Sequence, residues 1–232
     1  MKRFYTDVTV RADGTGFQVL LDGRGVKTPA GAGLTLPTRG LAEGIAAEWR
    51  SQGDVIAPHT MPLLRLANTA IDGIAPGPAP TRSAIARFGD DDLLCYRAGA
   101  PALLARRQAE SWDPLLAWVD ETFGARLAVT DAASHIDQPE QALTALAVQL
   151  EGHDAFALAG LHVIASITGS LVLALAAAGR IDAGQAFALS RIDEDFQAES
   201  WGRDSEAQAR ANHLAAEITH ACALIALSRP GV

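Results

Sequence analysis

A proline-rich segment at residues 76–80 divides the chain into two parts with different patterns. It places three prolines, Pro76, Pro78 and Pro80, in five consecutive positions. Proline lacks a backbone N–H and its ring clashes with the preceding helical turn, so the segment cannot lie inside a helix or a central strand. We therefore expect a domain boundary here, with one domain over residues 1–80 and a second over residues 81–232.

The first part combines the alternation of β-strands with the spacing of a helix. Apolar residues alternate along Val8–Val10 and Phe17–Leu21, and glycine-containing turns separate these segments. Leu41, Ile45 and Trp49 then follow at intervals of four, which places them on one face of a helix. The pattern predicts a small antiparallel sheet covered by a helix, with Trp49 in a structural role in the core.

Helical spacing dominates the second part. The expected fold class is therefore α+β, with a small N-terminal antiparallel-sheet-plus-helix domain followed by a larger all-helical domain. The segment Ala155–Ala178 contains no acidic residue, lysine or arginine. It is long enough to span a bilayer, but it is rich in alanine, is interrupted by polar residues and lacks basic flanks. We expect one buried central helix, in which Gly169-Ser170 permits close helix contact, and no stable membrane insertion.

The chain lacks the common sequence signatures of catalysis. A phosphate-binding loop would need glycine directly before Lys27-Thr28, where valine stands, and no Gly-x-Ser-x-Gly elbow occurs. Cys95 and Cys222 are far apart and form no zinc-binding pair. We therefore expect no cofactor, no metal and no enzymatic activity. The alternative is a helical metal-dependent enzyme that uses Glu217 and His220, which have the Glu-x-x-His spacing of di-iron bundles but occur in a single copy.

Negative charge gathers in a segment of helical spacing near residue 195. The formal net charge of the chain is −8, which argues against nucleic-acid binding. Leu189, Ile192 and Phe196 lie at positions i, i+3 and i+7 and predict a buried stripe, with Ile192 and Phe196 in structural roles. This phasing turns Asp193, Glu194 and much of Asp195 outward. The predicted partner-binding residues are Asp193, Glu194, Asp195, Glu199 and Trp201. Such a surface fits either an interface with a basic partner or an ordinary solvated face.

The acidic segment Ser190–Ala207 resembles the signature of a known protein family. Other stretches agree with that family in the same order along the chain: Arg3–Tyr5, Leu20–Pro29, Ala46–Gly53, Met61–Asp72, Asp92–Ala98, Trp112–Trp118 and Gly169–Ala176. The family is that of the assembly chaperones of the F-type ATP synthase that bind the alpha subunit of its catalytic sector. The resemblance implies a small α/β domain followed by an all-helical domain, in agreement with the boundary inferred from the prolines.

The resemblance also implies a function. A member of this family holds newly made alpha subunit and shields the surface that later faces the beta subunit, without hydrolysing ATP. The acidic position that the family needs falls on Asp193, and the tryptophan of its Glu-Trp pair falls on Trp49. Phe196 stands where tryptophan or tyrosine is usual, and Arg50 where an acidic residue is common. Members occur in mitochondria and alphaproteobacteria. Because no presequence or signal peptide is seen, we expect a bacterial cytoplasmic protein.

Overall fold

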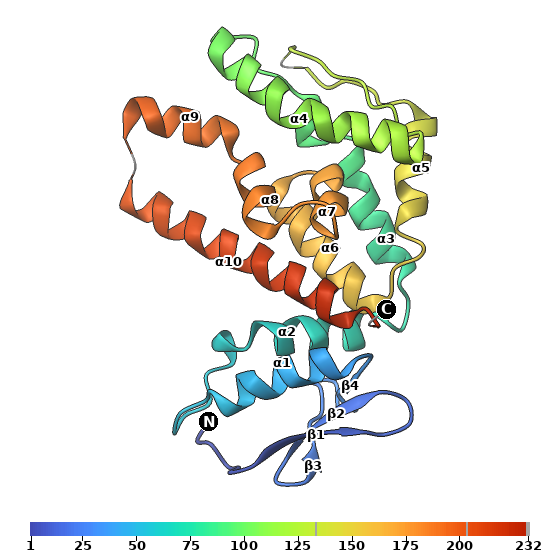
Figure 1. The fold of residues 1–232 in the computed structure, drawn as a ribbon, viewed down its shortest axis with the longest axis vertical. Coiled ribbons are helices and arrows are strands. Elements are labelled where there is room, and N and C mark those ends of the chain that lie inside the picture. Colours follow the sequence, from blue (N-terminus) through green and yellow to red (C-terminus); the bar gives the residue numbers. More distant parts are fainter. Residues whose placement is uncertain (133, 203, 231–232) are drawn as a thin grey trace. The chain divides into compact units, whose positions relative to one another are not determined.

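The computed structural model of the protein describes residues 1–132, 134–202 and 204–230, with Trp201 described by its main chain only. The chain divides into two compact units. Residues 1–78, 154–160 and those from His220 onward form the first, and residues 79–153 and 161–219 form the second. The predicted α+β class is confirmed, with a small antiparallel sheet near the N-terminus and helices thereafter (Figure 1). The predicted boundary lies close to Pro78, but the first unit also takes in two later segments that contiguous domains do not contain.

The sheet of the first unit is organised around its second strand. Strand β2 (Phe17–Leu21) pairs antiparallel with β1 (Val8–Ala12), β3 (Arg24–Gly25) and β4 (Thr35–Leu36). The β2–β3 hairpin turns at Asp22-Gly23, where φ is 47° and 77°. Positive φ at both central residues is what a tight two-residue hairpin requires, and aspartate and glycine tolerate it.

Helix α1 (Arg39–Arg50) packs against β1 and β2 and supplies much of the core of this unit (Figure 1). Thr38 caps the helix, because its side-chain oxygen accepts a hydrogen bond from the Leu41 N–H at 3.1 Å. Leu41, Ile45 and Trp49 are 0, 0 and 8% exposed. The spacing of these residues in the sequence therefore describes the face that the helix buries.

Side chains of α1 and the N-terminal segment hold the first unit together. The Tyr5 ring packs edge-on against Trp49 with 5.4 Å between ring centroids, and its hydroxyl donates to the Trp49 carbonyl oxygen at 2.7 Å. The Glu48 carboxylate accepts the N–H groups of Leu63 and Leu64 at 2.7 and 2.9 Å, which caps the helix that follows. The remaining elements of this region are η1 (Pro58–Thr60), α2 (Pro62–Thr69) and η2 (Ala70–Ile74), the last of which is π-helical.

The second unit consists of helices and the loops that join them. In chain order its elements are α3 (Ala79–Ala86), η3 (Arg87–Gly89), η4 (Leu93–Cys95), α4 (Ala102–Phe123), α5 (Glu140–Gln149), α6 (Ala155–Thr168), α7 (Leu171–Ala177), α8 (Ala183–Leu189), α9 (Ile192–Trp201) and α10 (Ser205–Ser228). Helices α6 and α10 contribute residues to both units. Every residue of α7 is buried, and α4 and α8 pack against it. Helix α7 is therefore the centre of this unit.

The apolar segment Ala155–Ala178 forms two helices and not the single helix expected. Gly169 has a φ of +66°, which side-chain-bearing residues rarely adopt, and α6 ends before it. Ser170 then caps α7 by accepting the Leu173 N–H at 2.9 Å. Gly169-Ser170 therefore separates two helices and does not serve as a helix contact. Within the described residues, no helix is both long enough and apolar enough to cross a membrane.

Close helix contact in the first unit depends on a different glycine, Gly160 on α6. A Cβ atom at this position would lie 2.6 Å from Cγ1 of Ile225 and 2.8 Å from the carbonyl oxygen of Ala221, both on α10. Both distances are shorter than van der Waals contact. The two helices approach this closely because position 160 carries no side chain.

A buried carboxylate joins η4 to the beginning of α7. Asp92 is fully buried, and its two oxygens accept the N–H groups of Leu94 and Val172, each at 3.0 Å. Burial raises the pKa of Asp92 to about 6, although hydrogen bonds from Val172, Ser170, Leu94 and Leu171 act to lower it. The interaction therefore orients α7 at the cost of removing a carboxyl group from water.

Gly160→Ala is expected to lower the free energy of unfolding by about 1–3 kcal/mol, because the added methyl group overpacks the contact between α6 and α10. Gly73→Ala is the matched control, since Gly73 lies in η2 of the same unit and a Cβ there would meet no atom within 4 Å. The control should be unchanged or more stable by up to about 1 kcal/mol. Urea unfolding followed by circular dichroism measures both variants, and equal midpoints would contradict the close contact.

Asp92→Asn is expected to change how stability depends on pH. The pKa of Asp92 in the folded protein, about 6, lies above its ordinary value of 3.8. The protonated carboxyl therefore stabilises the fold below about pH 4, and this contribution is lost as the pH rises through 6. The free energy of unfolding of the wild type, relative to that of the variant, should fall by about 2–2.5 kcal/mol between pH 4 and pH 7. Unfolding curves recorded across this range provide the measurement, and a difference independent of pH would refute the expectation.

Candidate functional site

The acidic segment forms its own short helix, α9, after a break from α8. Asp182 and Gln185 form a capping box at the start of α8, in which each side chain accepts the other residue's backbone N–H, at 2.8 and 3.0 Å. Helix α8 ends at Leu189, and α9 begins at Ile192 with three acidic residues in its first turn. Negative side chains are favourable at this end of a helix, where backbone N–H groups lack partners.

Leu189, Ile192 and Phe196 do not form the buried stripe expected from their spacing. All three are half-buried, and no described side chain of α9 is buried. Burial of an apolar face therefore does not account for the position of this helix. Its contacts with α4 include hydrogen bonds and an ion pair between polar and charged side chains.

One set of polar contacts fixes the beginning of α9. The fully buried indole of Trp112 donates from Nε1 to the Leu189 carbonyl oxygen at 2.9 Å. One turn earlier on α4, Gln108 donates from Nε2 to both carboxylate oxygens of Asp193 at 3.0 and 2.9 Å. Gln108 is 2% exposed, so this bond to an ionised group is shielded from competing water.

A second set of contacts fixes the later part of the helix. Arg107 donates to both carboxylate oxygens of Glu199 at 2.7 and 2.8 Å, and its guanidinium carbon lies 5.2 Å from the centre of the Phe196 ring. The hydrogen bond that Arg107 donates to Glu199 raises the pKa of Arg107 above its ordinary value. Phe196 thus contributes to the structure through the face of its ring and not through deep burial.

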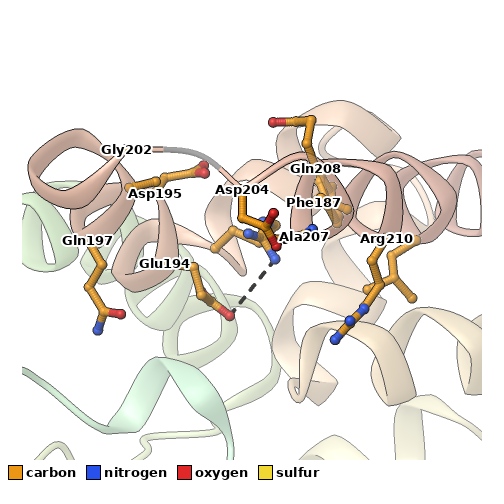
Figure 2. Close-up of a pocket in the computed structure, with 13 residues that line it drawn as sticks. Phe187, Glu194, Asp195, Gln197, Gly202, Asp204, Ala207, Gln208 and Arg210 are labelled. Atoms are coloured by element: carbon orange, nitrogen blue, oxygen red, sulfur yellow. Dashed lines mark hydrogen bonds and ion pairs between the residues drawn. The ribbon is translucent and has the colours of Figure 1, made fainter.

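The acidic residues of α9 divide into two groups. Asp193 and Glu199 are engaged by α4, so the outward orientation expected for Asp193 is not observed: it is half-buried against Gln108. Glu194 and Asp195 instead line a cleft formed with α10 (Figure 2). The helical phasing turned Asp193 outward together with Glu194 and was wrong for Asp193, because spacing does not reveal which of these residues has a partner inside the protein.

The cleft has a volume of about 580 Å³ and is lined by residues of α8, α9 and α10 together with Gly202 and Asp204 (Figure 2). Its charged lining residues are Arg191, Glu194, Asp195, Asp204 and Arg210. Its apolar lining residues are Phe187, Ala198, Ala207, Ala211 and Leu214. The Glu194 carboxylate lies 4.0 Å from the Arg191 guanidinium, and the Glu194 side chain is 56% exposed. This ion pair is therefore weak, and Glu194 can give up its contact with Arg191 to pair with a binding partner. The cleft therefore suits the binding of a polar or basic group beside an apolar one.

The other predicted site residues lie away from the cleft, or their side chains lie outside the described part of the molecule. The main chain of Trp201 ends α9, and its side chain lies outside the described part of the molecule. Trp49 belongs to the core of the first unit. Glu217 and His220 both lie on α10, and within the described residues no three His, Cys, Asp or Glu side chains gather in a way that could hold a metal ion.

Sequence reasoning missed the residues of α4 that hold α9. Trp112 opens one of the stretches that carry the family resemblance, but Arg107 and Gln108 look like ordinary surface positions of an amphipathic helix. Gln108 and Asp193 are 85 residues apart in the sequence. No local spacing pattern reveals a contact between residues so far apart.

The whole chain is similar to known proteins. A family model described as ATP12 chaperone protein matches residues 2–120. The mitochondrial protein atp12 of Schizosaccharomyces pombe is 25% identical over 215 residues, covering 87% of this chain and 74% of that protein. The crystal structure of Atp12 from Paracoccus denitrificans is 43% identical, with a TM-score of 0.95 and 98% of each chain covered. The Atu1473 protein of Agrobacterium tumefaciens is 44% identical, with a TM-score of 0.92, covering 98% of this chain and 85% of that one.

These matches cover both units and define a chaperone of α+β fold. The chain belongs to the ATP12 chaperone family. The resemblance to the assembly chaperones of the F-type ATP synthase, found first in the acidic segment and its accompanying stretches, is thereby confirmed.

Glu199→Lys is expected to increase amide hydrogen exchange throughout α9, because it places a second cation against Arg107 and removes the contact that fixes this part of the helix. Glu194→Lys is the control, since Glu194 is exposed and lies 4.0 Å from its cationic neighbour. Exchange in α9 of the control should remain close to that of the wild type. Mass spectrometry of exchanged peptides separates the two cases, and identical exchange in both variants would refute a role for the Arg107–Glu199 pair.

Proposed function

We propose that the chain is a non-catalytic assembly chaperone of the F-type ATP synthase and that its client is the alpha subunit of the catalytic sector. Membership of the ATP12 chaperone family carries this proposal, and the sequence resemblance supplies the client. The chaperone holds newly made alpha subunit and shields the surface that later faces the beta subunit. It needs no cofactor for this task and acts in the bacterial cytoplasm, in keeping with its similarity to proteins of Paracoccus and Agrobacterium.

The proposed client-binding surface is the side of α9 that borders the cleft. Glu194 and Asp195 supply negative charge there, and carboxylates of this kind attract a basic partner and accelerate its association. Phe187 and Leu214 supply apolar surface in the same cleft. An interface generally combines an apolar centre with a polar rim, and this part of the molecule offers both.

Reversing the charge of this surface tests the proposal. The double variant Glu194→Lys/Asp195→Lys is expected to capture at least about tenfold less alpha subunit, because like charges then face each other across the interface. Tagged protein and alpha subunit are co-expressed, and the captured protein is identified and quantified by mass spectrometry.

The control variant Glu121→Lys/Glu140→Lys makes the same change of net charge at exposed positions of α4 and α5. It should capture alpha subunit as well as the wild type does. Failure of the wild type to capture alpha subunit would refute the proposed client. Undiminished capture by the α9 variant would refute the proposed surface and leave the client unaffected.

A further inference from the structure

We propose that Asp193 is a positioning residue: it holds α9 on α4, and the client contacts the carboxylates that border the cleft with α10, Glu194 and Asp195. This inference rests on the proposed function and assigns different tasks to neighbouring residues of its site. The argument begins at Gln108, which is nearly inaccessible to solvent and has a hydrogen-bond partner at each end of its amide group.

The orientation of the Gln108 amide is determined by its surroundings. Its oxygen accepts the Ala98 N–H at 2.7 Å, and only the oxygen can do so, because a backbone N–H is a donor. The nitrogen must therefore face Asp193, where it donates to both carboxylate oxygens at 3.0 and 2.9 Å. A buried amide nitrogen without an acceptor would be costly, so Gln108 and Asp193 require each other.

Because the helix is rigid, this contact also fixes the direction in which the neighbouring acidic side chains point. Successive residues of an α-helix are rotated by about 100°, so fixing Asp193 against α4 directs residues 194 and 195 away from Gln108. The bond between Arg107 and Glu199 holds the other end of α9. No described side chain of α9 is buried, so these polar contacts determine which acidic residues border the cleft.

Exchanging the amide of Gln108 and the carboxylate of Asp193 distinguishes a positioning role of Asp193 from a direct contact of its charge with the client. Gln108→Glu keeps the size of the side chain and the acceptor for Ala98, but it sets a carboxylate against Asp193. Capture of alpha subunit should fall about tenfold, the equivalent of one lost hydrogen bond to a charged group. In the double variant Gln108→Glu/Asp193→Asn, the amide donor lies on α9 and the carboxylate on α4. The contact is restored although α9 has lost a charge, and capture should return to within about threefold of the wild type.

Two results would overturn the proposal. A double variant that captures as poorly as Gln108→Glu, while its α9 exchanges amide hydrogens like the wild type, would show that the client contacts the Asp193 charge itself. Wild-type capture by Gln108→Glu would also overturn the proposal.

Asp193→Asn alone provides a variant that is expected to fold in any case, because position 193 is half-buried and its amide oxygen still accepts from Gln108. Capture within about threefold of the wild type supports the positioning role, and a loss beyond about tenfold overturns it. If the wild type captures no alpha subunit, the proposed function fails by itself. Hydrogen exchange of α9 then still tests the positioning role, which requires faster exchange in Gln108→Glu and recovery in the double variant.

Discussion

The buried carboxylate of Asp92 is the interaction on which the arrangement of the second unit depends. It accepts the N–H of Val172 at the start of α7 and so fixes where that helix begins. Helix α7 is buried along its whole length, and α4 and α8 pack against it. Helix α4 carries the residues that hold α9, and α8 leads into it. The position of α9 is thus linked, through α7 and the helices packed against it, to one desolvated carboxyl group.

Hydrogen bonds between distant segments explain why the stretches that carry the family resemblance are scattered along the chain. Each stretch contacts another stretch or an element next to one. The pairs are Tyr5 with Trp49, Thr28 with Asp72, Glu48 with Leu63 and Leu64, Asp92 with Val172, and Trp112 with Leu189. In four of these contacts a side chain bonds to a backbone group, which depends on the local path of the chain as well as on residue identity.

The sequence allowed the sheet and helix α1 of the first unit to be predicted, and the site only in part. The apolar stripe of α1 meets an apolar sheet, so spacing alone describes its buried face. The same reasoning failed for α9, because spacing reveals which face of a helix is apolar but not what lies beneath it. Beneath α9 lie Arg107 and Gln108, whose partners are remote in sequence. Gly169-Ser170 was misread for a related reason: small residues suit both a helix contact and a helix end, and the backbone conformation decides between them.

The polar attachment of α9 has a consequence for how the proposed client would leave. A helix without a buried apolar face opens at a free energy well below that of the whole domain, because few contacts must be broken. The Arg107–Glu199 pair is partly exposed and weakens as salt screens it, whereas the Gln108–Asp193 bond is shielded. A client held by α9 could thus dissociate together with a local opening of that helix, without unfolding of its carrier. The time for which the client stays bound would then depend on the contacts between α4 and α9 as much as on the contacts of the interface itself.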